Sequence, residues 1–119
     1  MMAIVSSHIL DATDGTHAGG IQARLVSLTS ARQLFASESD PGGRILENVD
    51  VSEEAPDARY ELTFSTRPYW DRKPVPSPHA LDEIVLRFTM PDPEARYHLP
   101  LILSSHGYSA WVSAPEQLV

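Results

Sequence analysis

Apolar and polar residues alternate with a period of two along several segments of the chain. In Tyr60–Ser65, tyrosine, leucine and phenylalanine occupy every second position, between glutamate, threonine and serine. Residues 84–90 repeat the pattern with isoleucine, leucine, phenylalanine and methionine. Because successive side chains of a strand point to opposite faces, this alternation predicts strands with one face in the core and the other outside it.

A third alternating segment, Tyr97–Ser104, carries polar chemistry on its outer face. Its odd-numbered positions hold one tyrosine and three leucines, which form the core face. The opposite face carries His98, Pro100, Ile102 and the final serine. The alternation therefore predicts that His98 and Ile102 point away from the core.

Prolines and glycines divide the rest of the chain into short segments. The 119 residues include 10 prolines and 6 glycines, which favour strands joined by turns over long helices. The pattern predicts about eight strands in all. Besides the three segments above, strands are expected at Ala3–Leu10, Ile21–Leu28, Arg32–Ala36, Arg44–Val49 and Tyr108–Val112.

One short helix and one long loop are expected between these strands. Ser52 can cap a helix over Ser52–Ala58, where Glu53 and Glu54 suit the positive end of the helix dipole. Residues Arg67–His79, with four prolines, are expected to form an irregular loop. Short strands without βαβ alternation predict an all-β fold, an antiparallel β-sandwich formed by a single domain over residues 1–119.

Charge and composition exclude several classes of function. The formal charge of −7, from 16 acidic and 9 basic residues, argues against a nucleic-acid partner, which needs a basic face. The apolar runs are too short to span a bilayer, and the N-terminus lacks the pattern of a signal peptide. The chain has no cysteine, which fits a reducing compartment. We expect a soluble, cytoplasmic protein with no membrane partner.

Five histidines supply the candidate chemistry of this short chain: His8, His17, His79, His98 and His106. None is spaced like a metal-binding motif, so neither a metal nor another cofactor is expected. The sequence also lacks the Gly-x-Ser-x-Gly elbow of serine hydrolases and the glycine-rich loops that bind nucleotides.

His8 and His98 lie on outward strand faces, and Arg44 follows a glycine-rich turn. A neutral histidine can accept a proton from water near pH 7, and an arginine can stabilise a developing oxyanion. These residue types therefore suit hydrolysis of a carbonyl or amidine-like bond. The simpler alternative is a surface or interface role, and this is our interpretation of His17 and His106 and of the loop residue His79.

Four stretches, in order along nearly the whole chain, carry a family resemblance. They are Ser7–Asp11 followed by Gly15 and Ala18–Ile21, the pair Gly43-Arg44, the stretch Tyr60–Trp70, and Tyr97–Ser104 running on to Tyr108-Ser109. Together they resemble the transthyretin-like proteins and, within them, the 5-hydroxyisourate hydrolases of purine breakdown.

This resemblance implies a transthyretin-like sandwich of two four-stranded sheets and a homotetramer built as a dimer of dimers. It places the active site in the channel between dimers, with catalytic positions at His8, Arg44 and His98 and a small heterocyclic substrate. No cofactor is implied. The outward-facing Ile102 and Trp111 are candidate substrate-binding residues.

The sequence departs from the hydrolases at its C-terminus. Those enzymes end in a Tyr-Arg-Gly-Ser tetrapeptide that reaches into the site, and the matching residues here are Trp111, Val112, Ser113 and Ala114. Five more residues follow them. A longer tail resembles the transthyretin carrier branch, yet that branch lacks a histidine at the position of His98.

Two classes of function remain open. The first is a cofactor-free hydrolase that opens the ring of 5-hydroxyisourate, or a relative repurposed for another small-molecule ring. The second is a transthyretin-like protein that binds a small ligand in the channel. Retention of His8, Arg44 and His98 favours catalysis. The altered tail leaves the true substrate open, and with it the choice between urate breakdown and secondary metabolism. The sequence does not say which histidine is the general base.

Overall fold

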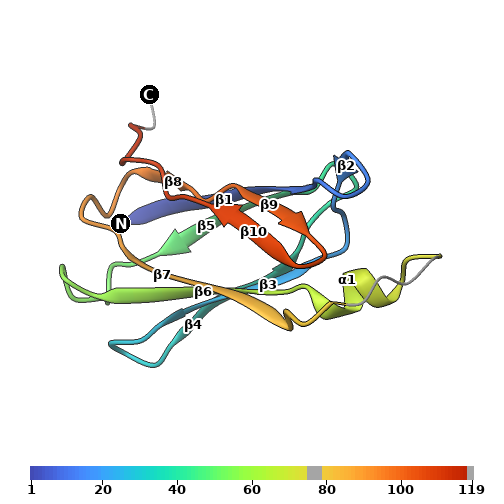
Figure 1. Ribbon diagram of the computed structural model, residues 1–119. Coiled ribbons are helices and arrows are strands. Elements are labelled where there is room, and N and C mark those ends of the chain that lie inside the picture. The colour runs from blue at the N-terminus through green and yellow to red at the C-terminus, as the bar shows by residue number, and fades with distance from the viewer. Residues whose placement is uncertain (75–78, 118–119) are drawn as a thin grey trace.

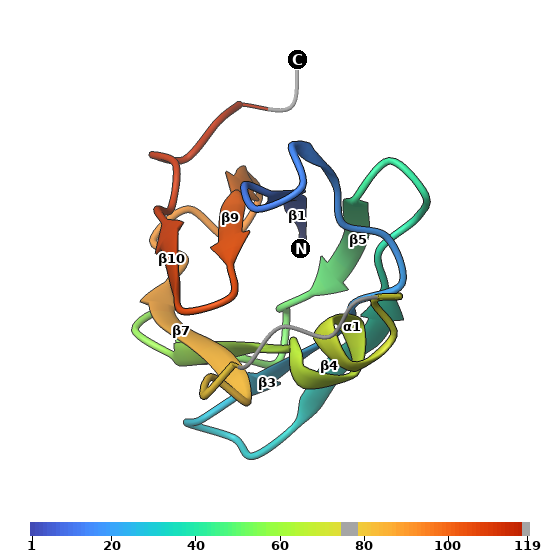
Figure 2. The ribbon, with the colours of Figure 1, turned by 45° about the vertical axis from the view of Figure 1, so that its right-hand side comes forward.

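Two β-sheets packed face to face, with a short helix at one end, form the part of the chain described by the computed structural model, residues 1–74 and 79–117 (Figure 1). Figure 2 shows the same two layers from a second direction. The predicted β-sandwich is confirmed. One sheet contains β1 (Met2–Asp11), β2 (Thr16–His17), β5 (Arg44–Asp50), β8 (Arg96–His98), β9 (Leu101–Ser104) and β10 (Gly107–Ala110). The other has the order β4 (Gln33–Glu38), β3 (Gln22–Ser27), β6 (Arg59–Ser65), β7 (Glu83–Thr89).

The first sheet is mixed, which corrects the prediction of a purely antiparallel sandwich. Its central strand β1 runs antiparallel to β5, from the pair Met2–Asp50 to the pair His8–Arg44. On its other side β1 runs parallel to both β8 and β9. After β7 the chain crosses to the first sheet, where β8 lies beside β1 and runs in the same direction as β1. Side-chain alternation is the same in parallel and antiparallel strands, so it could not reveal this direction.

The predicted strand Tyr97–Ser104 is divided into β8 and β9. Pro100 has no backbone N–H to donate to the ladder, and the break falls there. Together with the two-residue β2, this break gives ten strands in residues 1–74 and 79–117, where about eight were expected. Counted as continuous runs, the first sheet still has four long members: β5, β1, the β8–β9 run and β10. The four-stranded arrangement that the resemblance implies is therefore recognisable.

The core lies between the sheets, on the faces that the alternation predicted. Tyr60, Leu62 and Phe64 of β6 are buried, and so are the tyrosine and three leucines of the β8–β9 run. Each fully buried leucine or phenylalanine contributes about 1.5–3 kcal/mol of hydrophobic free energy. Leu86 and Phe88 remain half-buried because β7 is the edge strand of its sheet. No helix in the described part of the chain is long and apolar enough to cross a membrane.

The predicted helix over Ser52–Ala58 is wrong, and the segment forms successive turns. The carboxylate of Asp50 accepts a hydrogen bond from the backbone N–H of Ser52 at 3.0 Å, which starts a turn in place of a helical cap. Pro56 has no N–H for a helical hydrogen bond and biases Ala55 away from helical geometry.

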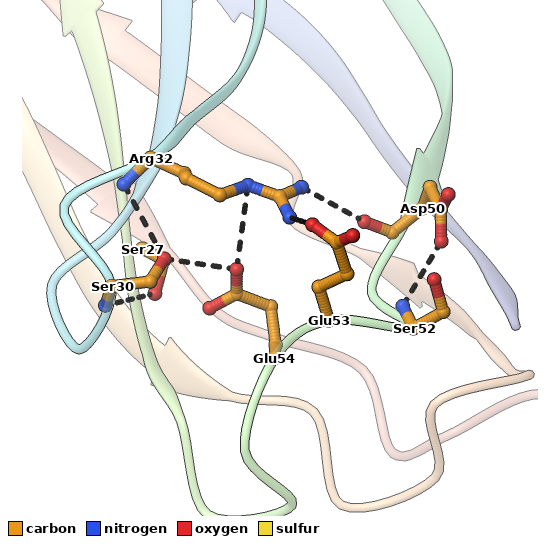
Figure 3. A network of polar contacts seen from close by, with 7 residues as sticks. All are labelled: Ser27, Ser30, Arg32, Asp50, Ser52, Glu53 and Glu54. Carbon is orange, nitrogen blue, oxygen red and sulfur yellow. Dashed lines mark hydrogen bonds and ion pairs between the residues drawn. The ribbon is translucent and has the colours of Figure 1, made fainter.

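The two glutamates of that segment form ion pairs instead of capping a helix. Arg32 lies with its Nη1 2.9 Å from Oε2 of Glu53 and its Nε 3.6 Å from Oε2 of Glu54 (Figure 3). Ser30 donates a hydrogen bond to the same Glu54 oxygen at 2.9 Å. This network joins the β3–β4 turn to the β5–β6 connection. Because the two segments are about twenty residues apart in the sequence, local pattern cannot predict the contact.

A helix occurs instead within the segment expected to be a loop. Helix α1 spans Arg67–Asp71, with Pro68 in its first turn, where the backbone N–H has no intrahelical partner in any case. Its residues Tyr69 and Trp70 are buried. Residues 75–78 of the expected loop lie outside the described residues.

Helix α1 braces the turn that follows β1. The Tyr69 hydroxyl donates to Oδ2 of the buried Asp11 at 2.7 Å, and Lys73 Nζ lies 3.0 Å from the same oxygen. Lys73 also pairs with Asp14 at 2.7 Å. Burial raises the pKa of Asp11, but the hydrogen bonds from Tyr69, from the backbone of Asp14 and from Lys73 outweigh it, so the pKa lies below its usual value. Asp11 is therefore a charged anchor for the β1–β2 turn.

Gly43, immediately before Arg44, offers a test of how tightly β1 and β5 are joined. Its φ is +78°, and a Cβ there would lie 2.2 Å from the carbonyl oxygen of Ile9. We expect Gly43→Ala to lower the free energy of unfolding by about 3 kcal/mol, measured by urea denaturation. The control is Gly15→Ala, with φ +69° but open space around its Cβ, which should cost only about 1 kcal/mol. Equal losses in both variants would contradict the close approach.

Candidate functional site

His8, Arg44 and His98 come together on the outer face of the first sheet. His8 lies directly opposite Arg44 in the β1–β5 pairing, and His98 lies opposite Ser6 in the β1–β8 pairing. Three strands that are distant in the sequence therefore bring the predicted residues into one place. They line a groove of about 280 Å³ together with Ser6, Ser7, Ile45, Leu46 and Arg96.

The ring of His8 is held through its Nε2 atom. This nitrogen lies 3.1 Å from the carbonyl oxygen of Gly42 and 3.2 Å from Nδ1 of His17. The two imidazole rings are stacked, with centroids 5.3 Å apart. A carbonyl oxygen can only accept a hydrogen bond, so His8 donates from Nε2. The neutral ring then keeps Nδ1 as its unprotonated nitrogen.

The ring of His98 is held through its other nitrogen. Nδ1 lies 2.9 Å from the hydroxyl oxygen of Ser6, so Nε2 is the ring nitrogen that this contact does not use, and His98 lines the groove. Burial lowers the pKa of His98, and the positive charge of Arg96 lowers it further. The weaker effects of His8 and Arg44 act in the same direction, while Glu116 opposes them. His98 is therefore neutral near pH 7, because its usual pKa is already about 6.5.

The groove is cationic although the chain as a whole is acidic. Its lining includes Arg44 and Arg96, and no aspartate or glutamate of residues 1–74 and 79–117 is among the lining residues. The whole chain carries a formal charge of −7. Two guanidinium groups beside two imidazoles suit a ligand that presents carbonyl oxygens or develops negative charge on them.

The C-terminal tail lies along β8 as a continuation of β10. The backbone N–H of His98 donates to Oγ of Ser113 at 2.9 Å, and the N–H of Ser113 donates to the carbonyl oxygen of His98 at 2.9 Å. Further on, Arg96 and Glu116 exchange backbone hydrogen bonds of 2.8 and 2.9 Å. The tail thus supports β8 from its outer side, and its described residues, up to Gln117, are not among those that line the groove.

The two predicted substrate-binding residues lie apart from this groove. Ile102 lines a second hollow of about 400 Å³ on the same sheet, with His17, Leu10 and the turn after β1. Trp111 is 56% exposed at the bend between β10 and the tail and lines neither hollow. A role of Ile102 and Trp111 in substrate binding stays a prediction.

Three residues at the site were missed by the sequence reasoning: Ser6, Arg96 and His17. Ser6 precedes His8 by two positions, and Arg96 precedes His98 by two positions. Because strand residues two apart share a face, the alternation itself could have found both. The contact between His17 and His8 depends on the β1–β2 turn and left no such signal.

Comparison with known proteins places this arrangement in a family. The chain is 30% identical to the 5-hydroxyisourate hydrolase of Pseudomonas aeruginosa, over 92% of this chain and 90% of that protein. The structure of Klebsiella pneumoniae 5-hydroxyisourate hydrolase aligns with a TM-score of 0.74 at 25% identity, over 93% of this chain and 99% of that one. A crystal structure of (S)-allantoin synthase aligns with a TM-score of 0.78 at 26% identity, but this chain spans only 44% of its length. Residues 5–112 match the HIUase/Transthyretin family, and the chain belongs to that family.

Proposed function

We propose that this chain is a cofactor-free hydrolase that opens the ring of 5-hydroxyisourate, a step of purine breakdown, by cleaving a cyclic amide C–N bond. One observation carries the proposal: His8, Arg44 and His98 line a single cationic groove. Membership of a family that contains 5-hydroxyisourate hydrolases of about 30% identity supports the choice of substrate. The lack of cysteine fits a cytoplasmic location.

The groove supplies a base that activates the attacking water and a cation that stabilises the negative charge formed on the carbonyl oxygen. His8 accepts a proton from water at Nδ1, and the resulting hydroxide adds to the ring carbonyl carbon. Arg44, opposite His8 on β5, donates hydrogen bonds to the carbonyl oxygen as it becomes an oxyanion. When the tetrahedral intermediate collapses, the C–N bond breaks and protonated His8 gives its proton to the ring nitrogen, which regenerates the neutral base. His98, on the other side of β1, stays neutral and donates a hydrogen bond from Nε2 to the substrate.

A second candidate function is favoured by the hollow beside Ile102. Leu10 and Ile102 give it an apolar lining next to the catalytic groove, as expected of a transthyretin-like site for a small ligand. Turnover separates the two functions. A hydrolase consumes a molar excess of freshly generated 5-hydroxyisourate, whereas a binding protein retains at most a stoichiometric amount unchanged. Consumption of a different heterocycle, with 5-hydroxyisourate untouched, would identify a repurposed family member.

The assembly that we propose with this function is a homotetramer, a dimer of dimers that covers the outer face of the first sheet. Apolar side chains on or near this face are poorly placed for a monomer: Leu46 is 55% exposed beside Arg44, and Val112 is 38% exposed in the tail. A closed symmetric assembly would bury them and shield the groove from bulk water.

Light scattering tests this assembly. We expect a mass of about four chains of 13.1 kDa each at micromolar concentration. Leu46→Glu should dissociate the tetramer because it places a charge in the covered face. The control is Leu28→Glu, at an exposed leucine after β3, which should leave the mass unchanged. A stable monomer of the unaltered chain would rule out a site in a channel between subunits.

A further inference from the structure

We propose that Arg96 is a positioning residue for His98: acting through Ser6, it fixes neutral His98 with its ring proton on Nε2, facing the groove. The catalytic consequence rests on the proposed function, because a proton held at Nε2 lets neutral His98 donate a hydrogen bond to the substrate. The arrangement itself is a property of the free protein. It can therefore be tested separately from the reaction.

The hydrogen bonds around Ser6 determine where the proton lies. Arg96 Nε lies 3.2 Å from Ser6 Oγ, and a guanidinium can only donate, so Ser6 accepts this bond. Ser6 Oγ lies 2.9 Å from His98 Nδ1, and Ser6 is 2% exposed. Within residues 1–74 and 79–117, Nδ1 is the one acceptor in reach of the serine proton. If His98 carried its proton on Nδ1 instead, the buried serine O–H would have no acceptor, which is costly.

The backbone of Arg96 is held in place by hydrogen bonds, and its bond to Ser6 uses only one nitrogen of the guanidinium group. Its backbone N–H and carbonyl oxygen both bond to Glu116 of the tail, and the carbonyl oxygen of the preceding Ala95 accepts a hydrogen bond from Ile4 of β1. Among the described residues, the side chain of Arg96 donates one hydrogen bond, from Nε to Ser6, and Arg96 is one of the residues that line the groove. Arg96 therefore also offers a second guanidinium to a carbonyl oxygen of the substrate, opposite Arg44.

Charged and titratable groups face His98 from each neighbouring element. Arg96 acts from β8, His8 from β1, Arg44 from β5 and Glu116 from the tail. Of the three that lower the pKa of His98 by their charge, Arg96 has the largest effect. Removing the charge of Arg96 should therefore raise the pKa of His98, even though burial of the ring is unchanged.

Nitrogen-15 NMR of the histidine rings reads this arrangement directly. In the unaltered protein we expect neutral His98 to show a protonated Nε2 and an unprotonated Nδ1. In Arg96→Gln the pKa of His98 should rise, whereas Arg24→Gln, at an exposed arginine of β3 in the other sheet, should leave it unchanged. Arg96→Lys keeps the charge but not the planar Nε–H, so it should restore most of the pKa. A proton on Nδ1, or a pKa that does not move in folded Arg96→Gln, would overturn the proposal.

Kinetics of the same variants report the consequence for catalysis. We expect Arg96→Gln and Ser6→Ala to lower kcat for 5-hydroxyisourate roughly tenfold, the scale of one lost hydrogen bond from a charged donor. Arg24→Gln should be unaffected. If the unaltered chain does not consume the substrate but His98 shows the expected NMR behaviour, the proposed function fails and the positioning role stands. If the chain is active and both variants keep full kcat, the positioning role fails and the proposed function stands.

Discussion

His98→Asn is expected to lower turnover of 5-hydroxyisourate by about a hundredfold or more without unfolding the protein. Asparagine can place an amide nitrogen near the position of Nδ1, but its side chain is too short to place a hydrogen-bond donor where Nε2 of the imidazole lies. The half-buried ring contacts Ser6 through its side chain, whereas its backbone bonds to Ser113 do not depend on the imidazole. A stopped-flow assay with freshly generated substrate measures the loss, and the urea midpoint checks the fold.

Arg44→Ala should cause a loss of similar size for a different reason. It removes the guanidinium that stabilises charge on the carbonyl oxygen, a contribution of about 3 kcal/mol or more. His106 is exposed in the β9–β10 turn and is not a groove residue, so His106→Ala should change turnover little. His17→Ala should also have a small effect, because Gly42 still holds Nε2 of His8. If all four variants had the same activity, the assignment of roles to these residues would be wrong.

Grafting the family tetrapeptide onto the tail is expected to raise the rate of 5-hydroxyisourate loss by tens-fold. The graft is Val112→Arg, Ser113→Gly and Ala114→Ser, with the chain ended at residue 114. A charged hydrogen bond to the substrate is worth about 2 kcal/mol or more, and the natural tail has no arginine or lysine, while none of its residues up to Gln117 lines the groove. The graft keeps the backbone of residue 113, which pairs with His98, and gives up the Ser113 hydroxyl contact.

Truncation after Ala114 without the substitutions is the matched control. It removes the backbone bonds between Glu116 and Arg96 but adds no cation. We expect this control to be no faster than the natural chain. A natural chain that is already as fast as the graft would mean that another group, for which Arg96 is the structural candidate, has replaced the tail arginine. A graft that stays slow while the tetramer persists would mean that the groove is shaped for a different ring.

Much of the sandwich was predictable because period-two alternation reports burial directly. The inner faces of β6 and of the β8–β9 run were read from the spacing of their aromatic and aliphatic residues. The helix was not predictable in this way. Glu53 and Glu54 look like a helix N-terminus, but their ion-pair partner Arg32 is about twenty residues away in the sequence, and Pro56 interrupts the segment. The true helix begins at Arg67 beside a proline that usually signals a loop.

The sequence named three residues that line the candidate groove but not the contacts that connect them. Outward alternation identified His8 and His98, the glycine-rich turn drew attention to Arg44, and resemblance to a known family implied that all three are catalytic. What local pattern could not supply was the parallel pairing of β1 with β8, since register between strands 90 residues apart is set by the whole fold. That pairing places Ser6 between Arg96 and His98. It is also what makes the two histidines of the groove chemically distinct.

One measurement tests the central claim most directly. The purified, unaltered chain and its His98→Asn variant are mixed in parallel with freshly generated 5-hydroxyisourate, in molar excess over protein, and loss of substrate is followed by ultraviolet absorbance. We predict multiple turnovers by the unaltered chain, above the spontaneous rate in buffer, and a return to about the buffer rate in the variant. Loss at the buffer rate with both proteins, or equal acceleration by both, would contradict the account of this groove as a hydrolase site.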